Sequence, residues 1–263
     1  MGLQLADNVA LVTASSSGLG KASAAVFAEE DANVVINGRD NSRLEDPVEE
    51  LDALGDGEVI GVSGDLTDPE DIETLVGRTL EEFGRLDHLV TNAGGPPSGP
   101  FLETTEEDWY EAFDLLVMSV VRLVNEAVDP LRESEHGTIV NITSRSVKEA
   151  IESLVLSNSV RMGVIGLEKT LSKELTPEVR ANAVLPAPHE TARIQKLVEQ
   201  GVKRGEYDSL EAGLEERGAD NPMGRIGQPR ELGEVVAFLS SPRSSYVNGT
   251  AITVDGGDSN SNL

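Results

Sequence analysis

Residues 8–20, NVALVTASSSGLG, decide the fold of this chain. The run from Asn8 to Thr13 is short, apolar and rich in β-branched residues, which predicts a buried strand. A turn rich in Ser and Gly follows, and the stretch Lys21–Glu30 has the composition of a helix. Strand, turn and helix in this order predict the opening unit of an α/β fold, with a ligand bound at the turn.

The same alternation continues along the chain. Further strands are predicted at Val34–Asn37, Val59–Val62, His88–Thr91, Thr138–Thr143, Ala181–Val184 and Ala251–Val254. Further helices are predicted at Arg43–Leu54, Pro69–Phe83, Glu106–Leu131, Leu156–Leu175 and Arg230–Leu239. This pattern implies a single Rossmann-type domain over residues 1–263, with one doubly wound parallel sheet of about seven strands and helices on both faces. The polar region Pro186–Gln228 is expected to be an irregular loop that closes as a lid over a ligand.

Composition excludes several classes of function. The 263 residues include 47 Asp and Glu against 21 Lys and Arg, a formal net charge of −26. No stretch forms the basic patch that nucleic-acid binding requires. Cys is absent and the three His residues lack metal-ligand spacing, so we expect neither a disulfide nor a bound metal. No apolar run approaches the roughly 20 residues of a membrane span, which predicts a cytoplasmic protein without a membrane partner.

The acidity needs a physical cause. Self-repulsion at this charge density destabilises a compact state in dilute buffer, whereas molar salt shortens the Debye length to about 3 Å and removes most of the repulsion. The composition therefore favours a halophilic protein from a saline cytoplasm. The alternative is a protein of ordinary salt habitat that happens to be acidic.

The turn after the first strand has the features of a phosphate site. Gly18 and Gly20 let the backbone approach a pyrophosphate, and the exposed amides and dipole of the following helix favour its charge. The whole turn resembles the Thr-Gly-x-x-x-Gly-x-Gly fingerprint of the short-chain dehydrogenase/reductase family. The resemblance implies dinucleotide contacts from Thr13, Ser15, Ser16, Gly18, Leu19 and Gly20. Ala14 stands where the family usually has its first Gly, a mild departure if the φ of Ala14 is negative.

The position after the second strand indicates which dinucleotide is bound. Members of this family that use NAD place an Asp there, and this chain has Gly38 followed by Arg39. A guanidinium suits bidentate recognition of a 2′-phosphate, so NADP is the predicted cofactor and NAD the second choice. The alternative is that Arg39 only pairs with Asp40 or solvates a loop.

Other motifs extend the resemblance over residues 6–257. Asp65 and Leu66 resemble the family's adenine-contacting pair, and Asn92-Ala93-Gly94 resembles its Asn-Asn-Ala-Gly motif. Pro186 and Thr191 resemble the ends of the segment that contacts the nicotinamide carboxamide. Taken singly, the polar motifs are also ordinary turn sequences.

The catalytic positions depart from the family pattern. Ser144 stands in the position of the family's Ser, but Ser157 replaces its Tyr, Arg161 replaces its Lys and Leu116 replaces its Asn. An aliphatic hydroxyl is a far weaker acid than a phenol, so Ser157 is a poor proton donor. Arg161 is still able to bond a ribose hydroxyl but does not give up a proton. This divergent pattern resembles the branch of the family that is similar to β-ketoacyl carrier-protein reductases.

The resemblance implies an NADP(H)-dependent oxidoreductase for a small carbonyl compound or secondary alcohol, with an unconventional proton route. Ser144, Ser157 and Arg161 are the candidate catalytic residues. The alternative is a cofactor-binding sensor or assembly partner without reductase activity. His189 is an alternative proton carrier, although a His in such a loop is more often exposed. The family also implies a homodimer or homotetramer. Apolar residues of the two long helices, such as Val120 and Val164, are candidates for that interface and also for packing on the chain's own sheet, and both can hold at once.

Overall fold

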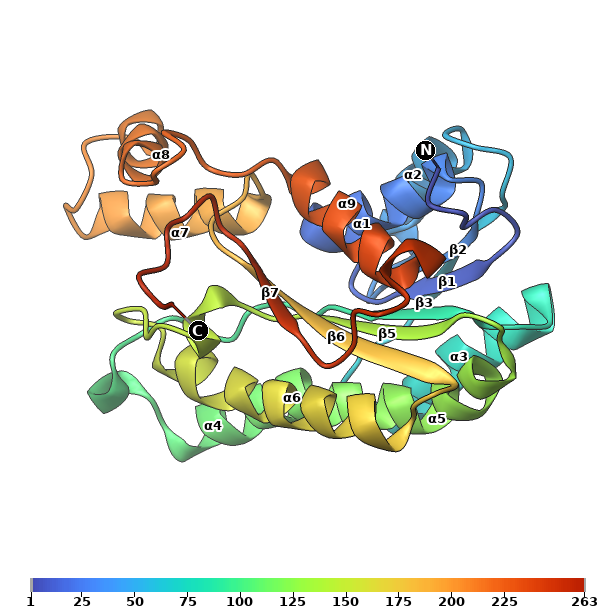
Figure 1. Ribbon diagram of the computed structural model, residues 1–263. Coiled ribbons are helices and arrows are strands. Elements are labelled where there is room, and N and C mark those ends of the chain that lie inside the picture. Colours follow the sequence, from blue (N-terminus) through green and yellow to red (C-terminus); the bar gives the residue numbers. More distant parts are fainter. Residues whose placement is uncertain (1, 263) are drawn as a thin grey trace.

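The computed structural model describes residues 2–262. Seven parallel strands form one sheet in the order β3-β2-β1-β4-β5-β6-β7, which confirms the predicted Rossmann-type architecture (Figure 1). The strands are β1 Val9–Val12, β2 Asn33–Gly38, β3 Val59–Ser63, β4 His88–Thr91, β5 Gly137–Ile142, β6 Val179–Pro186 and β7 Ala251–Val254. The order reverses direction between β1 and β4, so a crevice opens at their carboxyl ends.

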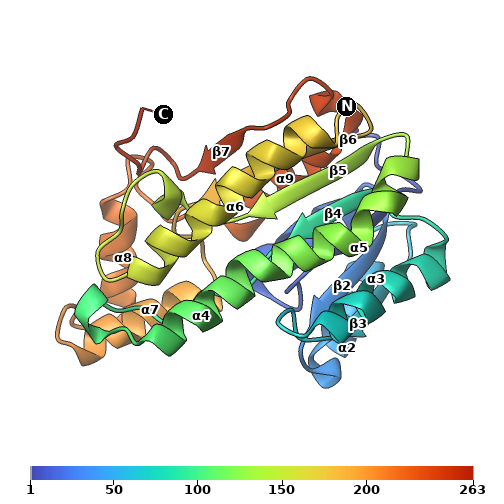
Figure 2. The same ribbon diagram turned by 90° about the horizontal axis from the view of Figure 1, so that it is seen from below.

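Helices cover both faces of this sheet (Figures 1 and 2). One face carries α1 Gly18–Glu29, α2 Glu45–Asp52 and α9 Pro229–Ser240, and the other carries α3 Pro69–Phe83, α4 Glu106–Phe113, α5 Ser119–Glu133 and α6 Val155–Glu174. Short helical turns lie at Asn41–Arg43, Phe101–Glu103, Arg145–Val147 and Pro242–Ser244.

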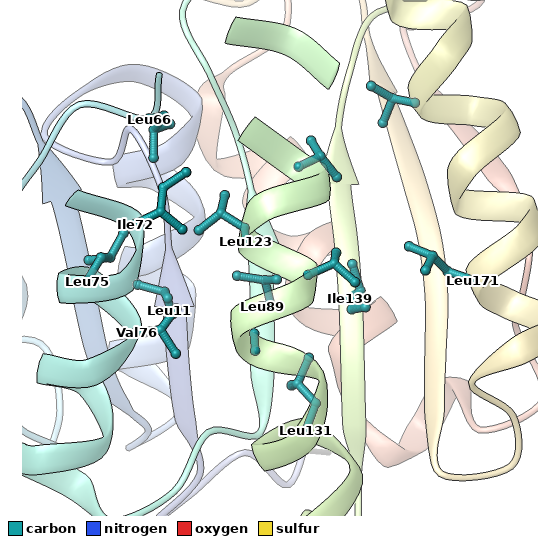
Figure 3. Packing of buried hydrophobic residues seen from close by; sticks show 14 of the residues in the cluster. Leu11, Leu66, Ile72, Leu75, Val76, Leu89, Leu123, Leu131, Ile139 and Leu171 are labelled. Carbon is teal, nitrogen blue, oxygen red and sulfur yellow. The ribbon is translucent and has the colours of Figure 1, made fainter. Parts of the chain in front are cut away.

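Side chains of each strand alternate between two apolar cores. In β1, Val9 and Leu11 face the core under α3, α5 and α6, whereas Ala10 and Val12 face the core under α1 and α9. Figure 3 shows the first core, where Leu11, Leu89 and Ile139 of the sheet lie opposite leucines of the helices. Val120 and Val164 also belong to this core, so they pack on the chain's own sheet.

The segment predicted as a helix at Glu106–Leu131 is helical throughout, but its middle departs from α-helical geometry. A π-helical segment, Asp114–Met118, separates α4 from α5. Each π turn inserts an extra residue into the hydrogen-bond ladder and so shifts the apolar face of the helix. Periodicity alone does not reveal such an insertion, because the apolar spacing remains near helical.

The prediction of an irregular Pro186–Gln228 region is wrong. The region contains α7 Ala192–Lys203 and α8 Leu210–Ala219, which pack together through Ile194, Val198 and Tyr207. These two helices lie beyond the carboxyl ends of the strands, on the left in Figures 1 and 2. Within the described residues, no helix combines the length and apolar character needed to cross a bilayer.

Candidate functional site

A cavity of about 860 Å³ lies at the carboxyl ends of the strands and extends under α7. Its volume is within the range of small-molecule sites in proteins. It is lined by most of the residues that the sequence singled out, namely Ser16, Gly18, Leu19, Arg39, Asp65, Leu66, Asn92, Ala93, Gly94, Ser144, Ser157, Arg161, Pro186 and Thr191. The topology therefore brings residues from six separate strand ends into one site.

The first turn presents free backbone amides to the cavity. Helix α1 begins at Gly18, whose φ is +62°, and the side chain of the N-cap residue Ser17 makes no capping hydrogen bond. The first N–H groups of the helix thus remain available for an anion. A Cβ atom on Gly20 would lie 2.6 Å from the carbonyl oxygen of Ala14, so Gly20 serves close packing of the turn.

Thr13, Ser15 and Gly20, for which dinucleotide contacts are predicted, are not among the residues that line the cavity. The Thr13 hydroxyl donates to the Asn92 carbonyl oxygen and accepts from the Asn92 amide, both at 2.8 Å. The Ser15 hydroxyl donates to the Val12 carbonyl oxygen at 2.6 Å and accepts from the Asn37 amide at 2.9 Å. These two hydroxyl groups hold the backbone of the turn in place on the side away from the cavity.

Ala14 has a φ of +46°, so the condition under which its departure from Gly is mild is not met. The left-handed region costs a residue with a Cβ atom about 1 to 2 kcal/mol. Asn37 and Asn92 hold the backbone in this conformation. The Ala14 amide donates to Asn37 Oδ1 at 3.2 Å, and Asn92 Nδ2 donates to the Ala14 carbonyl oxygen at 3.1 Å. Asn37 is a buried polar residue that sequence reasoning missed.

Arg39 lies at the end of the cavity beside β2 and β3. Its side chain is exposed and makes no hydrogen bond or ion pair with any described residue. The alternative pairing with Asp40 is not observed, because Asp40 accepts from Ser42 and lies 3.6 Å from Arg43. Asp65 accepts from the Thr67 amide, which lowers the pKa of the Asp65 carboxyl, with a smaller contribution from the charge of Arg39.

Three serines meet at the opposite end of the cavity. Ser144 Oγ accepts from the Ser146 amide at 3.1 Å, so it caps the turn after β5 while it lines the cavity. Ser157 Oγ, on α6, lies 3.2 Å from Ser146 Oγ. Ser146 is the buried link between the two predicted catalytic serines, and no sequence motif indicated it.

Arg161 lies one helical turn after Ser157 and is 8% exposed. Its Nε atom has no hydrogen-bond partner in the described structure. Burial, followed by the positive charge of Arg193, lowers the pKa of Arg161 to about 10, so the guanidinium remains charged at neutral pH. Leu116, from the π-helical segment, lines a small void of about 10 Å³ together with Arg161 and supplies no polar atom there.

Two residues after β6 differ from expectation. His189 is buried, not exposed, and its Nδ1 atom lies 2.8 Å from the Ala187 carbonyl oxygen, which accepts the ring proton. Burial lowers the pKa of His189, which favours the neutral ring. Arg193, at the start of α7, also lines the cavity, and its Nη2 atom donates to the Pro96 carbonyl oxygen at 3.0 Å. No sequence motif indicated Arg193, because α7 was not predicted.

The fold and the cavity define a Rossmann-type dinucleotide-binding class, and comparison with known proteins identifies the family. The model of a family described as "Enoyl-(Acyl carrier protein) reductase" matches residues 13–259. A 3-oxoacyl-[acyl-carrier-protein] reductase of Thermotoga maritima is 32% identical over 256 residues, covering 97% of this chain and 99% of the relative. The chain belongs to the short-chain dehydrogenase/reductase family of oxidoreductases.

Solved structures agree with this assignment. L-Sorbose reductase of Gluconobacter frateurii, in complex with NADPH and L-sorbose, superposes with a TM-score of 0.92 at 30% identity and 98% coverage of both chains. A variant of actinorhodin polyketide ketoreductase with NADPH superposes with a TM-score of 0.91 at 31% identity, covering 99% of this chain and 100% of that one.

Proposed function

We propose that this protein is an NADP(H)-dependent oxidoreductase that interconverts a small carbonyl compound and the corresponding secondary alcohol. The observation that carries this proposal is the continuous cavity, which runs from the free guanidinium of Arg39, past the amides at Gly18, to Ser144 and Ser157. Similar reductases of known structure bind NADPH in their crystals, which supports NADP over NAD.

The residues present fit such a cofactor. Gly18 and Ser16 offer donors to a pyrophosphate at the start of α1, and Arg39 is free to bond a 2′-phosphate. The buried, unpartnered donor of Arg161 suits a ribose hydroxyl. When bound, NADPH supplies the hydride, and the protein provides position and proton management.

The proton route differs from that of a phenol. A Ser hydroxyl does not give up its proton readily near neutral pH, and water is no stronger an acid. We therefore infer that water held by Ser144 and Ser157 relays a proton from the solvent to the carbonyl oxygen as negative charge develops on it. The positive charge of Arg161 stabilises the oxygen as negative charge develops on it. In the balanced reaction, the carbonyl carbon gains a hydride and its oxygen gains a proton, which gives the alcohol and NADP⁺.

A second candidate is a cofactor-binding protein without reductase activity. Among the described residues, none of the three tyrosines lines the cavity, so no phenol is at hand to donate the proton. The cavity would then serve recognition of the dinucleotide alone.

The two candidates are separated by following NADPH oxidation with a panel of small ketones and aldehydes. Turnover that decreases in Ser144→Ala and Ser157→Ala, with unchanged NADPH affinity, supports the reductase and its water-mediated route. Saturable NADPH binding without turnover of any panel member favours the second candidate.

A further inference from the structure

Two guanidinium groups line the cavity without a carboxylate partner, that of the buried Arg161 and that of the exposed Arg193. Arg161 projects from α6 and Arg193 from the first turn of α7, and both line the cavity. Neither forms an ion pair with any described residue, and the one hydrogen bond of Arg193 goes to a neutral carbonyl. In contrast, Arg122 and Arg225 each bind an acidic side chain within 2.7 Å.

Such an arrangement is unfavourable as it stands. Arg161 is buried, and a buried charge is stable only when it is paired. Arg193 is exposed to solvent, and its positive charge adds repulsion to Arg161. Burial and the charge of Arg193 both act to lower the pKa of Arg161. The chain carries a net charge of −26, so acidic residues are abundant. None of them forms an ion pair with Arg161 or Arg193 in the described structure.

The acidic residues that line the cavity do not compensate. Asp114 lies 2.7 Å from Arg122, which neutralises it. Glu111 and Asp65 also line the cavity, but among the described residues neither forms an ion pair with Arg161 or Arg193. Burial favours the neutral ring of His189. The part of the cavity that Arg161 and Arg193 line therefore keeps an excess of positive charge for an anionic ligand.

The short side chain of Ser157 leaves Arg161 accessible from the cavity. Positions 157 and 161 are one turn apart and share one face of α6, and both line the cavity. A ligand that contacts Ser157 therefore lies close to the guanidinium behind it.

We infer that the substrate is an oxo acid whose carboxylate binds between Arg161 and Arg193 while its carbonyl group faces Ser144 and Ser157. This inference rests on the proposed function and names its substrate class. Guanidinium groups bind carboxylates through paired, charge-assisted hydrogen bonds, and each has five N–H donors. Arg161 is thus able to serve a ribose hydroxyl and a carboxylate oxygen at once.

An anionic group also occurs in the dinucleotide, whose phosphates are a second possible partner of Arg193. The experiment therefore measures oxo acids, their esters and NADPH separately. Pyruvate, acetoacetate and levulinate place the carbonyl at three distances from the carboxylate, and their methyl esters lack the charge. Each compound is titrated by calorimetry into protein saturated with NADP⁺. The oxidised cofactor has no hydride to transfer, so the titration measures binding without turnover.

At least one acid is expected to bind more tightly than its ester. Arg193→Gln should weaken that acid about 10- to 100-fold and leave the ester nearly unchanged, as for loss of a hydrogen bond to a charged group. Arg193→Lys should retain part of the preference because it keeps the charge. Lys196→Gln is the matched control: it removes an exposed positive charge from the same helix, outside the cavity, and should leave the ratio of acid to ester affinity unchanged.

Equal affinity for acids and esters, or no binding of either, would overturn the inference. A loss of NADPH affinity in Arg193→Gln with an unchanged acid-to-ester ratio would assign Arg193 to the cofactor instead. The proposed function fails separately: oxo acids that bind through Arg193 but are not reduced by NADPH would contradict the reductase and leave the anion site intact.

Discussion

Arg39 carries the cofactor preference at the scale of a single residue. If its free guanidinium bonds the 2′-phosphate, Arg39→Ala should weaken NADPH binding by about 1.5 to 3 kcal/mol, the range for a hydrogen bond to a charged group. NADH, which lacks this phosphate, should bind almost as before. Fluorescence titration of both dinucleotides gives the two affinities.

Arg43→Ala is the control for this substitution. Arg43 is nearby, exposed and paired with Asp40, but it does not line the cavity. Its removal should change neither affinity. Equal losses for NADPH and NADH in Arg39→Ala would refute the assignment.

The sequence was least informative about the conformation and contacts of individual residues. The motif identified the phosphate turn, but it did not show that Ala14 adopts a positive φ or that Asn37 holds it. Both facts depend on contacts between residues more than twenty positions apart. Arg193 escaped notice for the same reason, because its role depends on where α7 lies relative to the sheet.

At the scale of an element, substitutions on one face of α6 test whether the site is still arranged for hydride transfer. The double substitution Ser157→Tyr with Arg161→Lys restores the residues that the family uses for proton transfer. General acid catalysis typically contributes about 10²- to 10⁴-fold, and the double variant should gain a fraction of this in ketone reduction. Leu116 limits the gain, since it supplies no polar group beside residue 161.

The single variants serve as controls for this gain. Each should gain less than the pair, because a Tyr without its Lys keeps a high pKa and a Lys without its Tyr has nothing to activate. Robust wild-type turnover that the double variant loses would show that Ser157 and Arg161 already form an efficient route.

The second half of α6 contains a buried acidic residue, Glu168, and its titration should make the stability of the protein depend on pH. Burial raises the pKa of Glu168 to about 7, from an ordinary value of 4.5. The folded state therefore retains a proton that the unfolded state loses between these values. This group lowers the free energy of unfolding by roughly 2 to 3 kcal/mol as the pH rises from about 4.5 to 7.

Glu168→Gln should remove this part of the pH dependence and be most stabilising above neutral pH. Denaturant unfolding at a series of pH values measures the effect. Glu174→Gln, exposed on the same helix, removes the same formal charge and should keep the wild-type slope. Identical profiles for the two variants would rule out a raised pKa at Glu168.

Elements were largely predictable because each strand is a short apolar run bounded by turn residues. The βαβ connections predict parallel strands with right-handed crossovers, but they do not predict that the strand order reverses between β1 and β4. The π-helical segment Asp114–Met118 was not predictable from periodicity. Helices α7 and α8 were missed because they pack mainly on each other through a small cluster, so their sequences are mostly polar.

At the scale of the whole molecule, the charge of −26 predicts salt-dependent stability. Molar salt shortens the Debye length to about 3 Å, which screens the repulsion among exposed carboxylates. The thermal midpoint should rise substantially between dilute buffer and molar KCl. Sucrose, which favours compact states without screening charge, should give a smaller rise. Equal midpoints in dilute buffer and molar KCl would contradict the proposed adaptation to a saline cytoplasm.

The central claim, that the cavity at the carboxyl ends of the sheet holds NADP(H), is tested most directly by titrating the wild-type protein with NADPH and with NADH. Nicotinamide fluorescence reports the bound fraction in each titration. The account predicts saturable binding of one NADPH per chain, with weaker binding of NADH. Tighter binding of NADH would contradict the role of Arg39, and no saturable binding of either dinucleotide would contradict the account as a whole.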